Sequence, residues 1–572
     1  MSSSTSRMLI VGIDFGTTYS GLAWAETQQP DRRSAITTWP INKTSREGES
    51  SEKVPTKLRY HGNDTQWGFS IPVNAPPKEV IEWFKLGLDP STEYTNNMIA
   101  TNSQGGRKKQ PEELARDFIS QLGHHLQYVL REKLGAAVLD SIPIRFVVTV
   151  PAMWSDLAKE KTRLACLHAD GLRATPNNLQ LISEPEAAAT YALHGLDHHG
   201  LKVNDTIVIV DAGGGTVDLI SYTITQLEPI LAVKETVPGT GGLCGSTYLN
   251  ERFQDLLRRK LGSQEGFDNE LVSDATEAFD KKIKRHYTTE TGDDEVFFIP
   301  VGGLANNAAL GVRKGRYSLK GSDIRDIFAP IIFDVVELVE DQVNACKTPP
   351  QAILLVGGFG SSTYLKECLR KAVGEDIRVL QPPNAWQAIV QGAVMKGLSS
   401  SDPDRLTTVQ IRDRKARKSY GIPVHVEYDE HEHGHLSGIP WWSDIEGHQR
   451  INVMSWFIER GETVSENKPI SHHFIRQGKT LELQRHFSLD IYTTESDPAP
   501  QVIGDEKVKV LATISVDLSP LPKSAFIMQI GADGLAYSTI IFHIETLYLS
   551  ASTEYSFWCQ GERYGSVNCE YA

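Results

Sequence analysis

Two short segments of this sequence combine aspartate, glycine and threonine in an order that suits phosphate chemistry. The first is Ile10-Val-Gly-Ile-Asp14-Phe-Gly-Thr-Thr18, and the second begins 197 residues later as Ile207-Val-Ile-Val-Asp211-Ala-Gly-Gly-Gly-Thr216-Val-Asp218. Each is an apolar run that ends in aspartate, followed by a Gly/Thr turn and another apolar run. The pattern predicts two β-hairpins with phosphate-sized turns, the first hairpin (residues 10–25) and the second hairpin (207–223).

The residue types in these turns indicate the ligand that they suit. Glycines let backbone N–H groups close around phosphate oxygens, and threonine hydroxyls donate further hydrogen bonds. The carboxylates of Asp14 and Asp211 cannot bind phosphate, but they can hold Mg²⁺ through its retained waters. One such turn is often an ordinary tight turn, whereas two in corresponding positions predict a duplicated fold that grips a nucleotide from both sides. A P-loop is excluded, because neither GxxxxGKS nor GxxxxGKT occurs in the chain.

The elements that must position these turns follow from the apolar pattern. Up to about Leu398, short β-branched runs alternate with amphipathic helical patterns, which indicates an α/β region. Helices are predicted from Pro111 to about Gly135 and from about Ala329 to Val343. The runs that predict strands cover residues 8–13, 145–150, 206–210 and 352–356. The expected α/β domain spans residues 1–398.

The remainder of the chain has a different pattern. Residues 399–418 are polar and predict a linker, which ends in five basic residues among the seven from Arg412 to Lys418. We interpret this basic run as a solvated surface, with contact to an anionic partner as the alternative. Beyond it, apolar and polar residues alternate with period two, for example over 514–518 and 542–549. This alternation predicts a smaller antiparallel β-rich domain at 419–572.

Composition narrows the class of protein. The chain has 572 residues, of which 40% are hydrophobic, and a net charge of −14, which disfavours nucleic acid as a partner. No apolar run approaches the roughly 20 residues that a membrane span needs. The six cysteines show no CxxC spacing, which is typical of a reducing compartment. We therefore expect a cytoplasmic protein, with the nucleus as a second compartment.

Further motifs stand in order with the two hairpins. They are Arg145 to Trp154 (RFVVTVPAMW), Ser183 to Ala189 (SEPEAAA) and Leu355 to Ser361 (LVGGFGS). Over residues 8–398 the chain resembles the 70-kDa heat-shock protein family, and it is most similar to the divergent, lid-lacking branch of fungi and animals. The resemblance implies an actin-like, ribonuclease H-like duplicated core of two lobes that converts ATP and water to ADP and phosphate.

The resemblance also implies a role for each matching residue. Asp14 and Asp211 would position Mg²⁺ and its waters, Glu184 would orient the attacking water, and Lys85 would be the catalytic lysine. Thr216 would hold the γ-phosphate. From the residues alone, Glu184 could instead be a helix N-terminal charge and Lys85 a surface lysine. The other expected nucleotide contacts are Gly16, Thr17, Thr18, Tyr19, Gly213, Gly214, Gly215, Asp218, Gly242, Gly245, Lys284, Arg285, Thr288, Gly357, Gly358, Phe359 and Ser361.

Three positions depart from the family pattern, and two of them lie around the adenosine. Lys281 stands where an acidic residue is expected, Ser361 replaces an arginine after the Gly-Gly pair, and Cys244 stands where glycine is common. Recognition of the base is therefore expected to differ from the family pattern more than recognition of the phosphates.

These features predict an ATP-hydrolysing chaperone with a stress-response role. Its β-domain would bind unfolded or apolar peptide segments, and co-chaperones are expected partners by analogy. One alternative is a nucleotide-binding scaffold or sensor with little turnover. Another, which the Glu184-Pro185 region and the β-rich tail disfavour, is a small-molecule kinase of the actin-like superfamily.

Overall fold

The computed structural model divides the chain into two compact units, Met1–Gln410 and Ile411–Ala572. The structure describes residues 6–42, 50–62, 64–73, 75–89, 109–195, 200–436, 438–466, 468–479, 486–566 and 568–571. Within these ranges, no helix combines the length and the apolar character that a membrane crossing demands.

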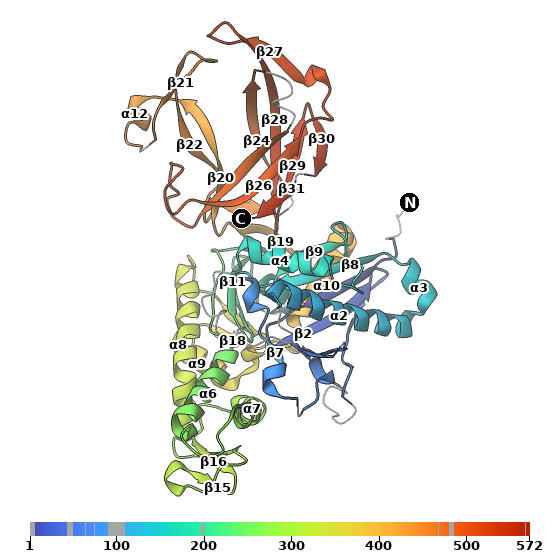
Figure 1. Ribbon diagram of the computed structural model, residues 1–572, viewed down its shortest axis with the longest axis vertical. Helices are drawn as coiled ribbons and strands as arrows, with labels where there is room; N and C mark the ends of the chain where they lie inside the picture. Colours follow the sequence, from blue (N-terminus) through green and yellow to red (C-terminus); the bar gives the residue numbers. More distant parts are fainter. Residues whose placement is uncertain are drawn as a thin grey trace. The chain divides into compact units, whose positions relative to one another are not determined.

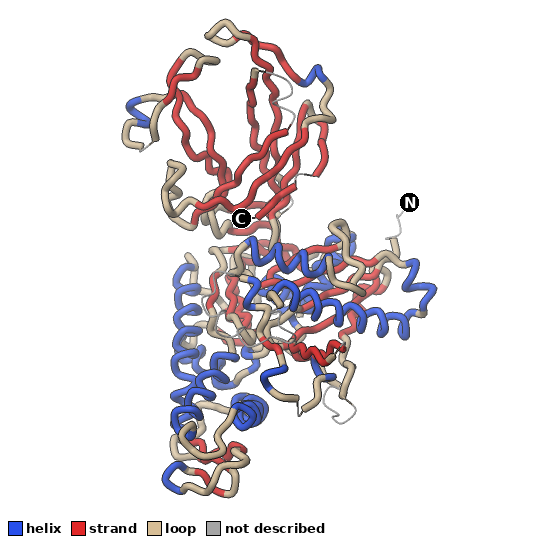
Figure 2. Tube along the Cα trace, in the orientation of Figure 1, coloured by secondary structure: helices blue, strands red, loops and turns tan. Residues whose placement is uncertain are grey.

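The first unit contains two sheets built on one plan (Figures 1 and 2). The strand order is β3-β2-β1-β8-β9 in the first sheet and β12-β11-β10-β17-β18 in the second. In both sheets the central strand pairs with an antiparallel hairpin partner on one side and a parallel strand on the other. The bounds are β1 Leu9–Asp14, β2 Tyr19–Glu26, β3 Gln29–Ala35, β8 Ile144–Val150, β9 Leu179–Ser183, β10 Thr206–Ala212, β11 Val217–Gln226, β12 Leu231–Glu235, β17 Ala352–Val356 and β18 Arg378–Leu380. The predicted duplication and both hairpins are confirmed.

Helices pack closely against these sheets. Gly12 on β1 faces α10, where an added Cβ would lie 2.6 Å from the carbonyl oxygen of Val390. Gly392 on α10 faces α5, where a Cβ would lie 1.7 Å from the carbonyl oxygen of Ala187. Glycine at both positions lets α10 contact β1 and α5 backbone to backbone. The helices are α2 Pro111–Leu134, α3 Ala136–Ser141, α4 Asp156–Leu167, α5 Glu184–His194, α6 Thr247–Leu261, α7 Asn269–Ala278, α8 Gly321–Ala345, α9 Thr363–Val373, α10 Ala388–Ser401 and α11 Pro403–Leu406.

Short elements complete the first unit. Two of its strands, β4 Val54–Pro55 and β13 Thr240–Gly242, extend the main sheets by pairing with β2 and β11. Two small sheets are made of β5 Lys57–His61, β6 Asp64–Trp67 and β7 Ile81–Glu82, and of β14 Val296–Pro300, β15 Val312–Arg313 and β16 Arg316–Lys320. The short helical turns are η1 Gly68–Ser70, η2 Pro77–Glu79, η3 Leu86–Leu88, η4 Phe279–Lys284, η5 Ala308–Leu310 and η6 Phe359–Ser361.

Helix α8 begins earlier than its apolar pattern predicts. It starts at Gly321 rather than near Ala329 and therefore contains Pro330. Proline has no N–H, so the carbonyl of Asp326, four residues earlier, loses its helical donor. The guanidinium of Arg252 on α6 donates to this carbonyl at 3.5 Å and to that of Ile327 at 3.1 Å. Arg252 of the neighbouring helix α6 thus donates the hydrogen bond that Pro330 cannot give to the Asp326 carbonyl.

The second unit is rich in antiparallel β-structure. Two sheets, in the orders β21-β22-β20-β25-β26-β31 and β24-β28-β29-β30 with β27 beside β28, contribute to one apolar core that includes Ile514 and Ile540. Helical turns among its described residues are α12 Glu430–His433 and η8 Lys523–Ala525. The strands are β20 Ser419–Glu427, β21 Trp441–Ser443, β22 His448–Ile458, β23 Thr463–Ser465, β24 Ile470–Gly478, β25 His486–Thr494, β26 Lys509–Asp517, β27 Phe526–Ile530, β28 Ala536–Tyr548, β29 Thr553–Cys559, β30 Glu562–Ser566 and β31 Asn568–Tyr571.

The segment predicted as a loop-like linker is largely regular structure. Residues 399–401 end α10, α11 follows, and β19 Val409–Lys415 pairs with β23. The interpretation of the basic run as a solvated surface is wrong at Arg414, which is buried with its guanidinium 3.1 Å from the carboxylate of Glu466. The basic pattern misled because the acid against which this arginine is buried, Glu466, lies 52 residues away in the chain.

Candidate nucleotide site

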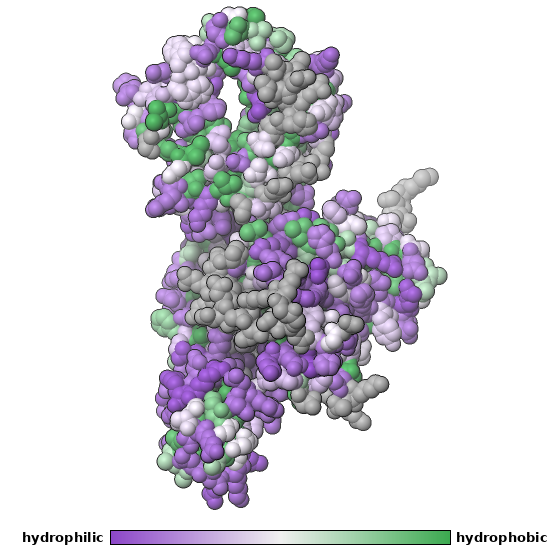
Figure 3. Space-filling view, viewed as in Figure 1, coloured by the Kyte–Doolittle hydropathy of each residue, from purple (hydrophilic) through white to green (hydrophobic). Residues whose placement is uncertain are grey.

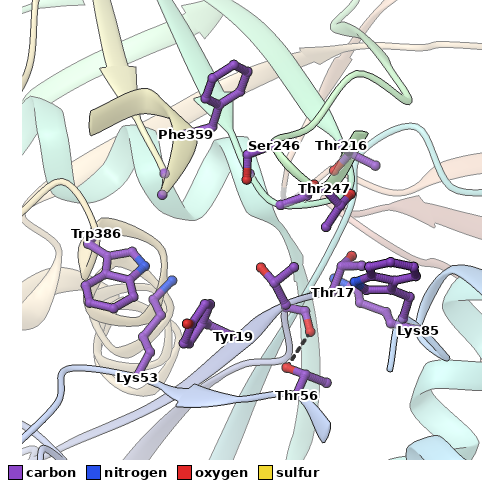
Figure 4. Close-up of a pocket in the computed structure, with 18 of the residues that line it drawn as sticks. Thr17, Tyr19, Lys53, Thr56, Lys85, Thr216, Ser246, Thr247, Phe359 and Trp386 are labelled. Atoms are coloured by element: carbon purple, nitrogen blue, oxygen red, sulfur yellow. Dashed lines mark hydrogen bonds between the residues drawn. The ribbon is translucent and has the colours of Figure 1, made fainter. Parts of the chain in front are cut away.

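A cavity of about 400 Å³ in the first unit brings the two hairpins together. Figure 4 shows side chains entering it from both lobes, with Thr17 and Tyr19 from the first hairpin and Thr216 from the second. All five residues predicted as catalytic line it, namely Asp14, Lys85, Glu184, Asp211 and Thr216. The predicted nucleotide contacts that also line it are Gly16, Thr17, Thr18, Tyr19, Gly213, Gly214, Gly215, Lys284, Arg285, Gly357, Gly358, Phe359 and Ser361.

The turns of the two hairpins lie in close contact at the cavity. A Cβ on Gly214 would lie 2.2 Å from the hydroxyl oxygen of Thr18, and one on Gly215 would lie 2.8 Å from that of Thr17. The second turn is closed by the Gly213 N–H, which donates to the Thr216 carbonyl at 2.9 Å. Glycine at these two positions therefore permits the close approach of the two turns.

Lys85 and Glu184 form a buried ion pair in the wall of the cavity. The Lys85 Nζ lies 2.6 Å from Glu184 Oε1, and their side chains are 1% and 9% exposed. Lys85 directly precedes η3, and its ammonium lies 5.2 Å from the ring centroid of Trp154 and 5.6 Å from that of Phe15. The alternative of a solvent-exposed surface lysine is wrong. Glu184 opens α5 directly after β9, so the strand end aims its carboxylate into the cavity.

Several carboxylates are buried close together in or beside the cavity. Four buried carboxylates, those of Asp14, Glu184, Asp211 and Asp218, form what we call the carboxylate cluster. Burial raises the pKa of Glu184 to about 7, with Asp218 and Asp14 adding to the effect and the Lys85 ammonium opposing it. Burial, followed by the charges of Glu184 and Asp218, also raises the pKa of Asp211 well above its ordinary value. The cluster therefore favours an added cation.

The carboxylate oxygens of this cluster are suited to Mg²⁺ that is held through its bound waters. Asp211 Oδ1 is buried and has no hydrogen-bond partner among the described residues. Those residues also offer no group of three or more His, Cys, Asp or Glu side chains placed to ligate a metal directly. An ion that keeps its hydration shell suits Asp211 Oδ1, because its waters would donate to this open carboxylate oxygen.

Four predicted contacts lie outside the cavity lining. Asp218 accepts hydrogen bonds from the backbone N–H groups of Ala152 at 3.0 Å and Met153 at 3.3 Å, so it joins β11 to the turn after β8. Gly242 pairs with Val217, and the backbone of Gly245 packs against Gly214. The N–H of Thr288 donates to the Thr291 hydroxyl at 3.4 Å. Asp218, Gly242 and Gly245 therefore make structural contacts within or next to the second hairpin. The sequence motif alone did not distinguish this structural role from contact with a ligand.

The side of the cavity expected to bind adenosine differs from the predicted pattern. The Lys284 ammonium pairs with Asp280 and donates to the Asn250 side chain at 3.1 Å, so this head group is already engaged. Asp280 supplies the acid that is missing at Lys281. It lies one residue earlier, in the π-helical turn η4, and lines the cavity.

A glycine turn and an aromatic ring form another part of the lining. Gly357 has φ +85°, and a Cβ there would lie 2.4 Å from the carbonyl oxygen of Ala212, so this turn requires glycine. Trp386 lies next to Gly358, with the indole Nε1 3.6 Å from the Cβ that a side chain would have there. Its ring meets Tyr19 edge-on at 5.7 Å between centroids. Trp386 thus adds an aromatic side chain to the lining, which also includes Ser361.

Sequence reasoning missed part of the lining. Trp386 and Lys53 are the most consequential omissions, and the other missed lining residues are Thr56, Lys57, Glu82, Trp83, Ser246, Thr247, Asn250, Asp280, Ser362 and Ile389. Ser246 and Thr247 could have been noticed as hydroxyl residues after Gly245 at the start of α6. No local pattern marks Lys53 or Trp386, because each reaches the cavity through tertiary packing.

A duplicated two-lobed core whose facing hairpins present glycine, threonine and aspartate to one cavity defines the actin-like class of nucleotide-binding proteins. The family described as "Hsp70 protein" matches residues 89–440, and the chain belongs to this family. A "Domain of unknown function (DUF8568)" matches residues 414–528.

Curated relatives support the same assignment. The chain is 25% identical to "Heat shock 70 kDa protein 12A" of Homo sapiens, over 91% of this chain and 86% of the human protein. It is 24% identical to human "Heat shock 70 kDa protein 12B", over 90% and 84%. It is also 24% identical to "Chaperone protein DnaK" of Thermosipho melanesiensis, over 71% and 63%. Family membership supports nucleotide binding.

Proposed function

We propose that this chain hydrolyses ATP in the cavity of the first unit and acts as a divergent chaperone of the heat-shock 70-kDa type. The observation that carries the proposal is the convergence of both phosphate hairpins on one cavity that also holds the buried Lys85–Glu184 pair. Phosphate turns bind the ligand, whereas a buried ammonium and carboxylate beside them supply groups that can act on it.

Different groups of the cavity would bind the phosphates and stabilise the transferring phosphoryl group. Backbone N–H groups of the two turns and the hydroxyls of Thr17, Thr18 and Thr216 would hold the β- and γ-phosphates. Bound Mg²⁺ would neutralise phosphate charge. The Lys85 ammonium would stabilise charge on the transferring phosphoryl group, and it holds Glu184 in place at 2.6 Å.

The Glu184 carboxylate is suited to orient water. As the water oxygen bonds to the γ-phosphorus and the bond to the β-bridging oxygen breaks, this carboxylate would accept the water proton. Burial raises its pKa to about 7, which is close to the pH at which such a base is most effective. The products would be ADP and inorganic phosphate.

The second unit supports binding of apolar peptide segments. Ile475 on β24 and Ile541 on β28 are cross-strand neighbours, and their side chains are 68% and 51% exposed. Ile527, Met528 and Ile530 on β27 are also exposed. Figure 3 shows apolar groups on the visible surface of this unit, including the region of β27. An extended apolar chain would find side-chain contacts on such a sheet. The expected compartment is the cytoplasm, with co-chaperones as further partners.

A second candidate function is a nucleotide-binding scaffold or sensor with little turnover. It is favoured by the engaged Lys284 head group and by Ser361 at an arginine position, since both alter the contacts that would hold the base. Such a protein would bind ADP and ATP without releasing phosphate.

Steady-state phosphate release from ATP with Mg²⁺, together with calorimetric ADP binding, tests the proposal. Slow turnover that Asp211→Asn abolishes supports the ATPase, and ATP-dependent release of a fluorescent apolar peptide supports the chaperone. Tight ADP binding without turnover favours the scaffold. Transfer of the γ-phosphate to an added metabolite would identify a kinase, and absence of nucleotide binding would overturn all of these functions.

A further inference from the structure

The carboxylate of the first hairpin has a lysine partner of its own. Lys53 Nζ lies 2.6 Å from Asp14 Oδ2, and the two side chains are 6% and 3% exposed. Both residues line the cavity (Figure 4 labels Lys53). A buried charge is costly without a partner, so this pair is a fixed feature of the site. It stands beside the phosphate turn, where a nucleotide's charge would fall.

The backbone around Lys53 is arranged to place its ammonium there. Strand β4 pairs with β2, with Val54 opposite Ser20, so Lys53 lies beside Gly21. A Cβ on Gly21 would be 3.4 Å from Lys53 Cγ and 3.8 Å from Cδ and Cε, which shows that the lysine stem runs along this glycine. The Ser51 hydroxyl donates to the Lys53 carbonyl at 2.7 Å. The Lys53 ammonium therefore reaches Asp14 with its stem packed along Gly21, which has no side chain to obstruct it.

This ammonium occupies the position of a cation in the carboxylate cluster. A lysine head group is a compact positive charge with three N–H donors, so it can bind a carboxylate and phosphate oxygens together. Asp14 Oδ2 already accepts from Lys53, so a hydrated metal ion would have to share this oxygen with the ammonium. Asp211 Oδ1, in contrast, is open among the described residues.

We propose that Lys53 is a built-in cation of the nucleotide site, which neutralises part of the phosphate charge that Mg²⁺ otherwise neutralises. Nucleotide binding to this chain therefore depends weakly on divalent metal. The inference rests on the proposed binding of adenine nucleotides in this cavity, and it assigns Lys53 as a positioning residue for the phosphate tail.

Calorimetric ADP binding to the full chain, in excess Mg²⁺ and in EDTA, tests this proposal. In the wild type, removing metal should weaken ADP binding by no more than about threefold, whereas in Lys53→Met it should weaken binding by about tenfold or more, the usual scale of a lost charge-assisted contact. Lys53→Arg, which keeps the charge, should retain the wild-type ratio. Lys161→Met is the control for loss of a lysine charge and should keep the wild-type ratio, because Lys161 pairs with Glu112 and does not line the cavity.

Metal binding gives a second readout that is independent of turnover. In the presence of ADP, electron paramagnetic resonance of free Mn²⁺ should show about tenfold tighter Mn²⁺ binding to Lys53→Met than to the wild type, because the competing ammonium is gone. Equal Mn²⁺ affinity in the two proteins would overturn the proposal.

The wild type alone also decides the question if the methionine variant does not fold. ADP binding that falls tenfold or more in EDTA would overturn the role of Lys53 while leaving nucleotide binding intact. Absence of ADP binding with Mg²⁺ present would instead overturn the proposed function itself, and the inference with it.

Discussion

The two phosphate hairpins share a local pattern but differ in the charges that face them. In the first hairpin Asp14 lies opposite Gly21, and in the second Asp211 lies opposite Asp218. The glycine makes room for the stem of Lys53, which brings a cation to Asp14. The aspartate instead adds another carboxylate behind Asp211. One cross-strand position thus decides whether the hairpin brings a positive or a negative charge to the cavity.

The consequence is a site with unequal halves. Asp14 accepts from Lys53 at 2.6 Å and from the Thr149 hydroxyl at 3.3 Å, so both of its oxygens have donors. Asp211 Oδ1 has none among the described residues, and burial raises its pKa. A duplicated motif therefore does not imply two equivalent aspartates. We expect Asp211 to be the carboxylate that depends most on a bound ion.

Replacing Asp211 should have the largest effect on activity. Asp211→Asn is expected to lower steady-state ATP hydrolysis by about 100-fold or more, since the open carboxylate can no longer hold the hydrated ion beside the phosphates. The ligand-free variant should melt at a higher temperature than the wild type, because a buried unpaired acid is removed. Asp14→Asn is the comparison variant and should lose less turnover, since both oxygens of Asp14 already accept hydrogen bonds, from Lys53 and Thr149. Equal losses of turnover in the two variants would contradict the asymmetry.

Breaking the Lys85–Glu184 pair should affect stability as well as turnover. Lys85→Met leaves a buried carboxylate without its ammonium and is expected to cost about 3 kcal/mol of unfolding free energy. The double variant Lys85→Met/Glu184→Gln should recover much of that stability while turnover remains lost. Urea unfolding of the two single variants and the double variant measures this coupling. Additive effects on stability would show that the pair is not the source of the loss.

The contact between the turns can be broken with one methyl group. Gly214→Ala would place a Cβ 2.2 Å from the Thr18 hydroxyl, so the Thr18 side chain or the two turns must shift, at a cost of about 1–3 kcal/mol. ADP affinity should fall together with the melting temperature. Gly302→Ala is the control, because a Cβ there meets no heavy atom within 4 Å and its backbone lies outside the left-handed region. An unchanged ADP affinity in Gly214→Ala would show that the turns do not act together.

The smallest expected effect is on the pH dependence of unfolding free energy and turnover, which should report the ionisation of the carboxylate cluster. Burial raises the pKa of Glu184 from its ordinary 4.5 to about 7, so its contribution to stability is complete below pH 4.5 and is lost as pH rises toward 7. Turnover should rise over the same upper range as the carboxylate ionises. Glu184→Gln should reduce the slope of unfolding free energy against pH between 4.5 and 7, although Asp211 adds a slope of the same sign. An unchanged slope would place the ionisation elsewhere.

Much of the fold could be read from local patterns. The apolar runs around Asp14 and Asp211 lie in strands β1 and β10, and Glu184-Pro185 opens α5, as predicted. The first residue of α8 could not be predicted from the local sequence, because Pro330 leaves the Asp326 carbonyl without its helical donor. Arg252 from another helix donates to this carbonyl. The basic run around Arg414 likewise required Glu466 before its burial made sense.

The sequence by itself determined the two hairpins, their duplication and the residue types that favour phosphate, because strand periodicity and glycine turns are local properties. Tertiary structure decided which of those residues face the cavity. It turned Asp218 toward backbone amides, brought Lys53 to Asp14 across 39 residues, and placed Trp386 beside Tyr19. Charge and access depend on neighbours distant in the chain, and no local pattern records them.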